Sequence, residues 1–172
     1  PVFRKDGSIT AGNASPLNDG ASAVLLGSES ASTMIGRDPI ARIAGRGVFA
    51  LDPQDFGYAP VEAANRALAG AGISWGTVGA VELNEAFAVQ SLACIDAWLK
   101  EGLTDPDLVN SKGGAIAIGH PLGASGGRLI GTLAAGLQER KERYGVAAIC
   151  IGVGQALAVV LENLEVAWFM ST

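Results

Sequence analysis

The stretch from Lys112 to Arg128 most strongly constrains what this chain can fold into. Six of the sixteen residues that follow Lys112 are glycines, and the only histidine of the chain, His120, lies among them. Glycine weakens helices and strands because it loses more conformational freedom on folding than any other residue. Such a loop suits a backbone that must approach another group closely or adopt a positive φ. An imidazole that titrates near neutral pH in this setting indicates an active-site loop.

The same loop does not match a nucleotide phosphate cradle. It lacks the Gly-Lys-Ser/Thr ending of that motif, and its lysine, Lys112, precedes the glycines. A net charge of −5 argues against non-specific binding to nucleic acid, which needs a basic face. No apolar run reaches the roughly 20 residues that cross a bilayer, so no membrane association is expected. Two cysteines do not form a disulfide framework, which favours a reducing, cytoplasmic location.

The length of 172 residues suits a single domain with a substantial core. An apolar run at 21–27 is consistent with a buried strand or a short helix. From Ile40 onward, apolar runs of strand length alternate with helical patterns. The predicted order β-α-β-α-β-α-β-β indicates an α/β fold, with a mixed sheet and helices on both faces. The predicted strands are 41–50, 78–83, 108–110, 146–151 and 156–161, and the predicted helices are 60–70, 85–100 and 125–140.

Three residues that can carry chemistry fall at the ends of predicted strands. Asn84 follows one strand, His120 lies in the loop after the next, and Cys150 lies near the end of the first strand of a hairpin. In sheets of this kind the reactive crevice lies at the carboxyl ends of parallel strands. An amide, an imidazole and a thiol that meet there predict acid–base and oxyanion chemistry.

Each candidate also has a purely structural interpretation. Asn84 could cap the helix that follows it, and a single histidine in a loop is often incidental. A free cysteine is usually a small buried hydrophobe, which is our interpretation of Cys94 on the inner face of a helix. Cys150 differs because it borders Gly152 and Gly154, whose backbone amides can remain free to face a ligand.

Four sequence blocks together resemble the carboxyl-terminal half of thiolases, which are acyl-CoA acyltransferases. They are Thr10-Ala-Gly-Asn-Ala-Ser15 with Asn18-Asp-Gly20, Asn84-Glu-Ala-Phe-Ala88, Gly113 to Arg128, and Cys150-Ile-Gly-Val-Gly-Gln155. They occur in the family's order and with similar intervals. The resemblance implies thiolysis of a 3-ketoacyl-CoA by CoA, or the reverse Claisen condensation of acetyl-CoA.

The resemblance also implies a role for each site residue. His120 would activate a nucleophilic cysteine and, with a water held by Asn84, bind the thioester oxygen. Cys150 would move the proton on or off the carbon next to the thioester, and the N–H of Gly152 would stabilise a second oxyanion. No metal and no cofactor is implied, and CoA is a substrate. The residues expected to contact CoA or substrate are Ala14, Ser15, Phe87 and Gly119.

The family's nucleophilic cysteine belongs to its amino-terminal half, and neither Cys94 nor Cys150 lies in that motif. We therefore expect the isolated chain to be inactive, and to associate with the missing half or with another copy of itself. The alternatives are a non-catalytic thiolase-like protein that binds acyl groups or lipids, and a ketosynthase. The second requires a histidine where Asn84 stands, which the single histidine excludes. By the resemblance, 1–38 ends the first half, 39–164 is the carboxyl-terminal domain, and 165–172 is a tail.

Overall fold

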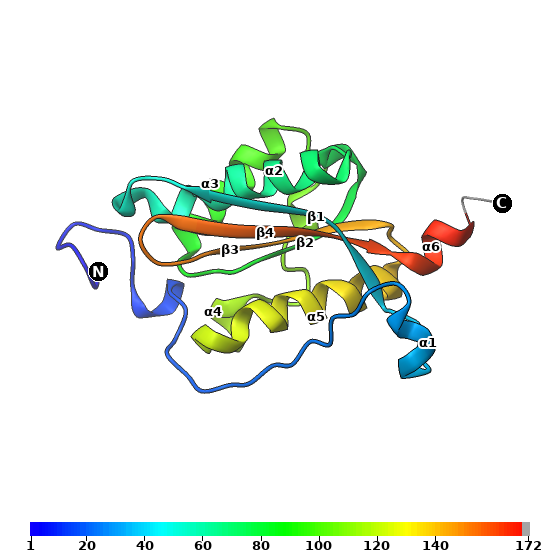
Figure 1. Ribbon diagram of the computed structural model, residues 1–172. Coiled ribbons are helices and arrows are strands. Elements are labelled where there is room, and N and C mark those ends of the chain that lie inside the picture. The colour runs from blue at the N-terminus through cyan, green and yellow to red at the C-terminus, as the bar shows by residue number, and fades with distance from the viewer. Residues whose placement is uncertain (170–172) are drawn as a thin grey trace.

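The computed structural model describes residues 1–169 and contains a four-stranded mixed sheet (Figure 1). Its strands are β1 (Ala41–Ala50), β2 (Val78–Leu83), β3 (Tyr144–Cys150) and β4 (Gln155–Asn163), arranged in the order β1-β4-β3-β2. The two strands β2 and β3 are parallel, whereas β4 runs antiparallel to both of its neighbours. The predicted α/β fold with a mixed sheet is confirmed.

Helices cover both faces of this sheet, as predicted. On one face lie α2 (Pro60–Ala71) and α3 (Ala88–Lys100), and on the other lie the short α4 (Ala115–Ile118) and the long α5 (Leu122–Arg140) (Figure 1). The sheet therefore separates two apolar cores, one beneath α2 and α3 and one beneath α5. The remaining helices are α1 (Ala31–Ile35), α6 (Leu164–Phe169) and the 3-10 turns η1 (Ala11–Asn13), η2 (Pro53–Tyr58), η3 (Trp75–Thr77) and η4 (Pro106–Leu108).

Local sequence explains where the longer helices begin and what they bury. Pro60 occupies the first position of α2, where its missing N–H costs nothing, and Gly72 ends the helix with a φ of 69°. In α5 the leucines at 129, 133 and 137 recur at helical spacing and are fully buried against the sheet. No helix within residues 1–169 is both long and apolar enough to span a lipid bilayer.

Glycines in β1 allow α2 to lie directly on the strand. A Cβ atom added to Gly47 would lie 1.9 Å from the carbonyl oxygen of Ala63, and one added to Gly45 would lie 2.1 Å from that of Ala67. Both obstacles are backbone atoms of the packed helix, so they cannot rotate away. The strand and helix are close because neither presents a large side chain at the contact.

We expect Gly47→Ala to destabilise the chain by about 1–3 kcal/mol, the usual cost of overpacking a core. Gly131→Ala is the matched control, because nothing lies within 4 Å of the added methyl group. There the loss of a glycine from a helix interior should stabilise the chain by about 0.5–1 kcal/mol. Urea unfolding followed by circular dichroism measures both free energies, and a neutral Gly47→Ala would contradict the close packing.

The predicted strand at 108–110 is wrong. The 3-10 turn η4 occupies Pro106–Leu108, and only a single parallel bridge joins Val109 to Val81. The side chain of Asn110 then takes the place of a strand: its Oδ1 accepts from the N–H of Leu83 and its Nδ2 donates to the carbonyl of Leu83, both at 2.8 Å. A side-chain amide can imitate a peptide group in this way, which the apolar pattern did not reveal.

Other parts of the chain also differ from the prediction. The segment 21–27 is neither a strand nor a helix, and all of its residues are exposed. The third predicted helix begins earlier, at Leu122, and is preceded by the unpredicted α4. Helix α3 begins at Ala88 rather than at Glu85. The expected tail at 165–172 begins within α6, and its last three residues lie outside the described part.

Candidate active site

Asn84 and His120 meet at the carboxyl end of β2. The N–H of Asn84 donates to the carbonyl of Ala148 at 2.9 Å, which extends the pairing of β2 with β3. The Asn84 side chain is completely buried, and its Nδ2 lies 3.3 Å from Nε2 of His120. Phe87, not Asn84, is the N-cap residue of α3, so the capping interpretation of Asn84 is wrong.

A chain of hydrogen bonds orients the His120 imidazole. Its Nδ1 lies 2.6 Å from the hydroxyl of Ser125, and that hydroxyl lies 3.2 Å from the carbonyl of Pro121. A carbonyl can only accept, so the Ser125 hydrogen satisfies Pro121 while the Ser125 oxygen accepts from Nδ1–H. In the neutral ring Nε2 then carries the lone pair and accepts from the Asn84 amide. The nitrogen that faces Asn84 is therefore the one able to accept a proton.

Ser125 holds the His120 ring, a role that the sequence analysis did not predict. It is fully buried in the first turns of α5, five residues after His120. The available signal was a serine just inside the helix that follows the histidine loop. That signal is weak, because serine is common near helix starts for reasons of capping alone.

Burial lowers the pKa of His120 below its ordinary value of 6.5, and the nearby positive charge of Arg128 lowers it further. Arg128 itself pairs with the buried carboxylate of Glu82 at 3.2 Å. The imidazole is therefore mostly neutral at pH 7, which is the form that a general base requires.

The single histidine makes this pKa directly measurable. We expect the His120 signals in an NMR titration to show a midpoint below 6.5, and Arg128→Gln to move it upward. The folded state binds this proton more weakly than the unfolded state does. The contribution of His120 to the free energy of unfolding should therefore be fully present above pH 6.5, and it should be lost as the pH falls from there through the folded-state pKa of His120. A folded-state midpoint at or above that of the chain in denaturant would contradict the buried environment.

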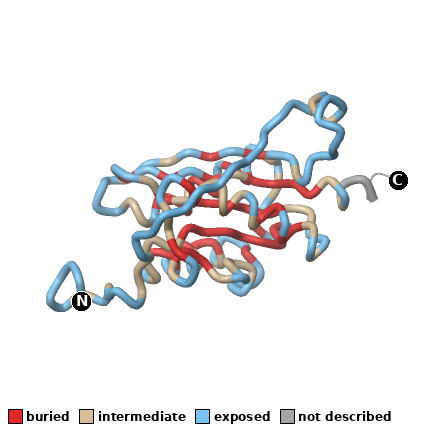
Figure 2. The backbone as a smooth tube through the Cα atoms, turned by 90° about the horizontal axis from the view of Figure 1, so that it is seen from below, coloured by how far each residue is buried: buried red, intermediate tan, exposed pale blue. Residues whose placement is uncertain are grey.

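An exposed segment, residues 16–30, crosses the histidine loop and α5 and is called the crossing segment below (Figures 1 and 2). Within it, the Asn18 Oδ1 accepts from the backbone N–H of His120 at 2.8 Å, and the Ser22 hydroxyl donates to the carbonyl of Ala124 at 2.7 Å. Gly119 is buried, and a Cβ there would lie 2.6 Å from the Asn18 amide. Gly119 also has a φ of 103°. The glycine is thus needed for both its conformation and its contact with Asn18.

Cys150 ends β3 at the same edge of the sheet, two residues beyond the carbonyl that pairs with Asn84. Its thiol is buried, and burial raises its pKa above the ordinary value. In the part of the chain that the structure describes, no hydrogen bond joins this thiol to Asn84 or His120. The structure thus brings Asn84 and His120 into contact and places Cys150 on the adjacent strand end.

Cys94 is the more deeply buried thiol, as expected for a small core residue. Burial raises its pKa to about 12, against a smaller opposing effect of a hydrogen bond from Gln90. Its Sγ donates to the carbonyl of Gly57 at 3.3 Å. A thiol held in its protonated form in this way is a poor nucleophile.

Gly152 lies at the exposed tip of the β3–β4 hairpin. Its neighbour Val153 has a φ of 63°, a strained conformation for a β-branched residue, and Gly154 has a φ of 84°. The carbonyl of Gly154 accepts from the N–H of Leu51 at 2.9 Å, so the tip is docked on the end of β1. Across residues 1–169, the N–H of Gly152 has no hydrogen-bond partner and is free to face a ligand.

Three of the four residues predicted to contact substrate, Ala14, Ser15 and Phe87, lie together. Ala14 and Phe87 form an antiparallel bridge, and the backbone N–H and hydroxyl of Ser15 both donate to the carbonyl of Ala86. Phe87 also packs edge-to-face against Phe3, with 5.8 Å between the ring centroids. The first and second sequence blocks are therefore neighbours in space.

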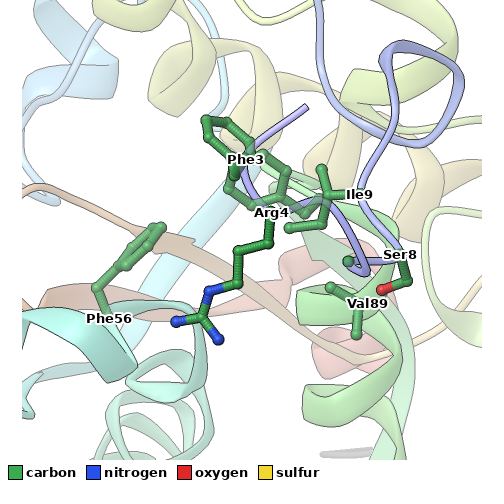
Figure 3. Close-up of a pocket in the computed structure, with 8 residues that line it drawn as sticks. Phe3, Arg4, Ser8, Ile9, Phe56 and Val89 are labelled. Carbon is green, nitrogen blue, oxygen red and sulfur yellow. The ribbon is translucent and has the colours of Figure 1, made fainter. Parts of the chain in front are cut away.

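A cavity of about 480 Å³ opens beside Phe87 (Figure 3). Its wall is largely apolar, and Arg4 extends between Phe56 and Val89 in this view. The residues that line this cavity do not include Asn84, His120 or Cys150. The cavity is lined by Phe3, Arg4, Gly7, Ser8, Ile9, Phe56, Phe87 and Val89.

The sequence of this chain matches the models of one known protein family. Residues 37–163 match the model of the thiolase C-terminal domain, and residues 1–30 match part of the thiolase N-terminal domain. The chain belongs to the thiolase family. The first match contains Asn84, His120 and Cys150, so all three are part of a thiolase C-terminal domain.

Individual thiolases show the same likeness. The chain is 47% identical to a 3-ketoacyl-CoA thiolase of Photorhabdus laumondii over 96% of its own length, and 48% identical to an acetyl-CoA acetyltransferase of Paracoccus denitrificans over 95%. It spans only 42% and 41% of these two relatives. The crystal structure of the Bacillus anthracis acetyl-CoA acetyltransferase superimposes with a TM-score of 0.86 at 40% identity, covering 95% of this chain and 40% of that one.

A human mitochondrial 3-ketoacyl-CoA thiolase has been solved in complex with CoA. It matches with a TM-score of 0.82 at 40% identity, again over 95% of this chain and 40% of its own. The structural similarity thus extends over 95% of this chain, and residues 1–30, before β1, match the thiolase N-terminal domain.

Proposed function

We propose that this chain is the carboxyl-terminal part of a thiolase that transfers acyl groups to and from CoA. The observation that carries the proposal is the contact between Asn84 and His120, with Nε2 oriented as a proton acceptor at the strand end beside Cys150. The nucleophilic cysteine would come from an amino-terminal half. The isolated chain should therefore be inactive.

In thiolysis the cysteine thiolate of that half would attack the 3-keto carbon of the substrate, after His120 has accepted its proton. The bond between carbons 2 and 3 then breaks, leaving an acyl group on the cysteine and the enolate of acetyl-CoA. Cys150 would donate a proton to that enolate. The thiol of CoA would next give its proton to the Cys150 thiolate and, as a thiolate, displace the nucleophilic cysteine from the acyl group. This releases the shortened acyl-CoA, and the displaced cysteine regains its proton from His120. Two proton carriers are needed because two different atoms gain or lose protons.

Developing negative charge on oxygen would be stabilised at two places. The buried Oδ1 of Asn84 lacks a hydrogen-bond partner anywhere in residues 1–169, and it is the atom that would hold a water donating to the thioester oxygen. The free N–H of Gly152 would supply the second donor. Preorganised donors of this kind typically contribute about 10²–10³-fold to turnover.

The CoA-binding region would include the neighbouring Ala14, Ser15 and Phe87, with Gly119 closing the loop side. The apolar cavity beside Phe87 suits a pantetheine or acyl chain, which has methylene groups along its length. Soaking or titrating with CoA, and observing which backbone amides of 14, 15 and 87 shift by NMR, tests this assignment.

Association with an amino-terminal half is supported by the apolar side chains that the chain exposes. Leu17 is 90% exposed, Leu25 78% and Leu122 68%, and all three lie on the crossing segment or at the start of α5. The crossing segment contacts α5 through Ser22 and Ala124, and exposed apolar side chains on such adjoining segments are typical of surfaces that other protein covers. A second copy of the chain is the alternative occupant, and both free thiols fit a reducing compartment such as the cytoplasm.

The decisive experiment combines this chain with a thiolase amino-terminal half, supplied from the Paracoccus denitrificans relative, and measures thiolysis of acetoacetyl-CoA. We expect turnover by the complex and none by either part alone. Size-exclusion chromatography shows whether the complex forms. Turnover by the isolated chain, or a stable complex that binds CoA without any thiolysis, would contradict the proposal. The second result would favour a non-catalytic acyl-binding protein.

A further inference from the structure

We propose that Glu85 is a positioning residue that fixes the loop carrying His120, a role that rests on the proposed function of that loop. Glu85 directly follows Asn84, whose side chain touches the imidazole. Its Oε2 accepts from the backbone N–H of Ile116 at 3.0 Å, at the start of α4. Only three residues separate Ile116 from His120.

Gly114 provides independent evidence that the Glu85 carboxylate belongs under this loop. A Cβ added to Gly114 would lie 2.2–2.4 Å from three atoms of the carboxylate. The φ of Gly114 is −106°, a value open to any residue, so its backbone does not require glycine. The close approach of Glu85 is therefore what excludes a side chain at this position.

Asn110 connects Glu85 to the sheet. Its Nδ2 donates to Oε1 of Glu85 at 2.8 Å, while the same amide pairs with the backbone of Leu83 at the end of β2. Asn110 has a φ of 49°, which asparagine tolerates better than most residues. Contacts thus run from β2 through Asn110 and Glu85 to Ile116 without a break.

This arrangement fixes two groups relative to each other. Asn84 is anchored to the sheet by its backbone, and Glu85 anchors the loop to the same strand end. The distance between the Asn84 amide and the His120 ring therefore depends on the Glu85 carboxylate. Both carboxylate oxygens accept from groups of the chain itself, so Glu85 acts through His120 and does not touch substrate.

Glu85→Gln tests the proposal, because it keeps the size of the side chain but turns one accepting oxygen into a donor that faces another donor. In the complex with the amino-terminal half, we expect kcat to fall by about 10–100-fold, as for a displacement of about 1 Å at a reacting group. KM for CoA should stay unchanged, and the His120 NMR signals and titration midpoint should shift. Glu62→Gln is the matched control, since Glu62 pairs with Arg66 on the exposed surface of α2.

A double-mutant cycle makes the test specific to the contact. Gly114→Ala alone should displace the carboxylate and lower kcat in the same way as Glu85→Ala. In the double variant the added methyl group meets no carboxylate, so the combined loss should be clearly smaller than the product of the two single losses. If Glu85→Gln does not fold, Gly114→Ala carries the test.

A Glu85→Gln protein with wild-type kcat and unchanged His120 signals would overturn the proposal. A variant that only unfolds more easily, while its folded form keeps both properties, would overturn it too. Independent losses in the double-mutant cycle would do the same. If the wild-type complex has no thiolase activity, the proposed function fails, but the His120 signals of the isolated chain still decide whether Glu85 positions the loop.

Discussion

Replacing His120 by alanine should reduce thiolysis by the reconstituted complex by at least about 10³-fold, since a general base contributes about 10²–10⁴-fold. The structure gives the physical reason. The ring is held by Ser125 on one nitrogen and faces Asn84 with the other, so alanine removes the only imidazole able to accept the proton. The measurement is the rate of acetoacetyl-CoA cleavage at saturating CoA.

Two further variants separate this effect from a loss of structure. Ser125→Ala retains the ring but removes the 2.6 Å contact, so its loss should be intermediate. Gln138→Ala, at the far end of α5, should leave the rate unchanged. The assignment of His120 would be wrong if His120→Ala kept more than about a tenth of the activity, well above what loss of a general base leaves.

Changing Cys150 to serine should separate the two halves of the reaction. Acylation of the nucleophilic cysteine should persist, because in the proposed function that step uses His120 and not Cys150. Exchange of the proton next to the thioester should fall by at least about 10²-fold, the lower end of the range for a proton-transfer group. The hydroxyl of serine is a far weaker acid than a thiol, even a thiol whose pKa is raised by burial.

The same substitution at the other cysteine is the control. Cys94 is buried on α3 and donates to Gly57, so Cys94→Ser should keep exchange at the wild-type rate. Mass spectrometry of the acylated protein and deuterium incorporation into acetyl-CoA measure the two steps separately. If exchange of the proton next to the thioester persisted in Cys150→Ser, or was lost in Cys94→Ser, the roles assigned to the two thiols would be wrong.

Much of the fold could be predicted because its elements are encoded locally. Strands β1 and β2 and helix α2 follow directly from apolar periodicity and from the proline and glycine at the helix ends. The segment 108–110 is different, because the apolar pattern predicted a strand there and the structure has none. The place of that strand is taken by one bridge and by the side chain of Asn110, and pairing through a side chain leaves no periodic signal.

In the candidate site, too, some features could be predicted from local sequence and others could not. Its chemical groups were recognisable because the histidine and Cys150 lie close to glycines, and because Asn84 directly follows an apolar run. The partners of those groups were not recognisable, because Asn18 and His120 are 102 residues apart and Glu85 and Ile116 are 31 apart. Contacts between such distant residues depend on how the helices pack, which no local pattern records.

By itself, the sequence determined the α/β class, the order of most elements and the residues that can carry chemistry, because each of these depends on a residue and its near neighbours. Only the tertiary structure decided which nitrogen of His120 faces Asn84, and that Ser125, Asn18 and Glu85 hold the loop. The physical reason is that hydrogen bonds are directional and short, so a partner is chosen by its final position rather than by its place in the chain.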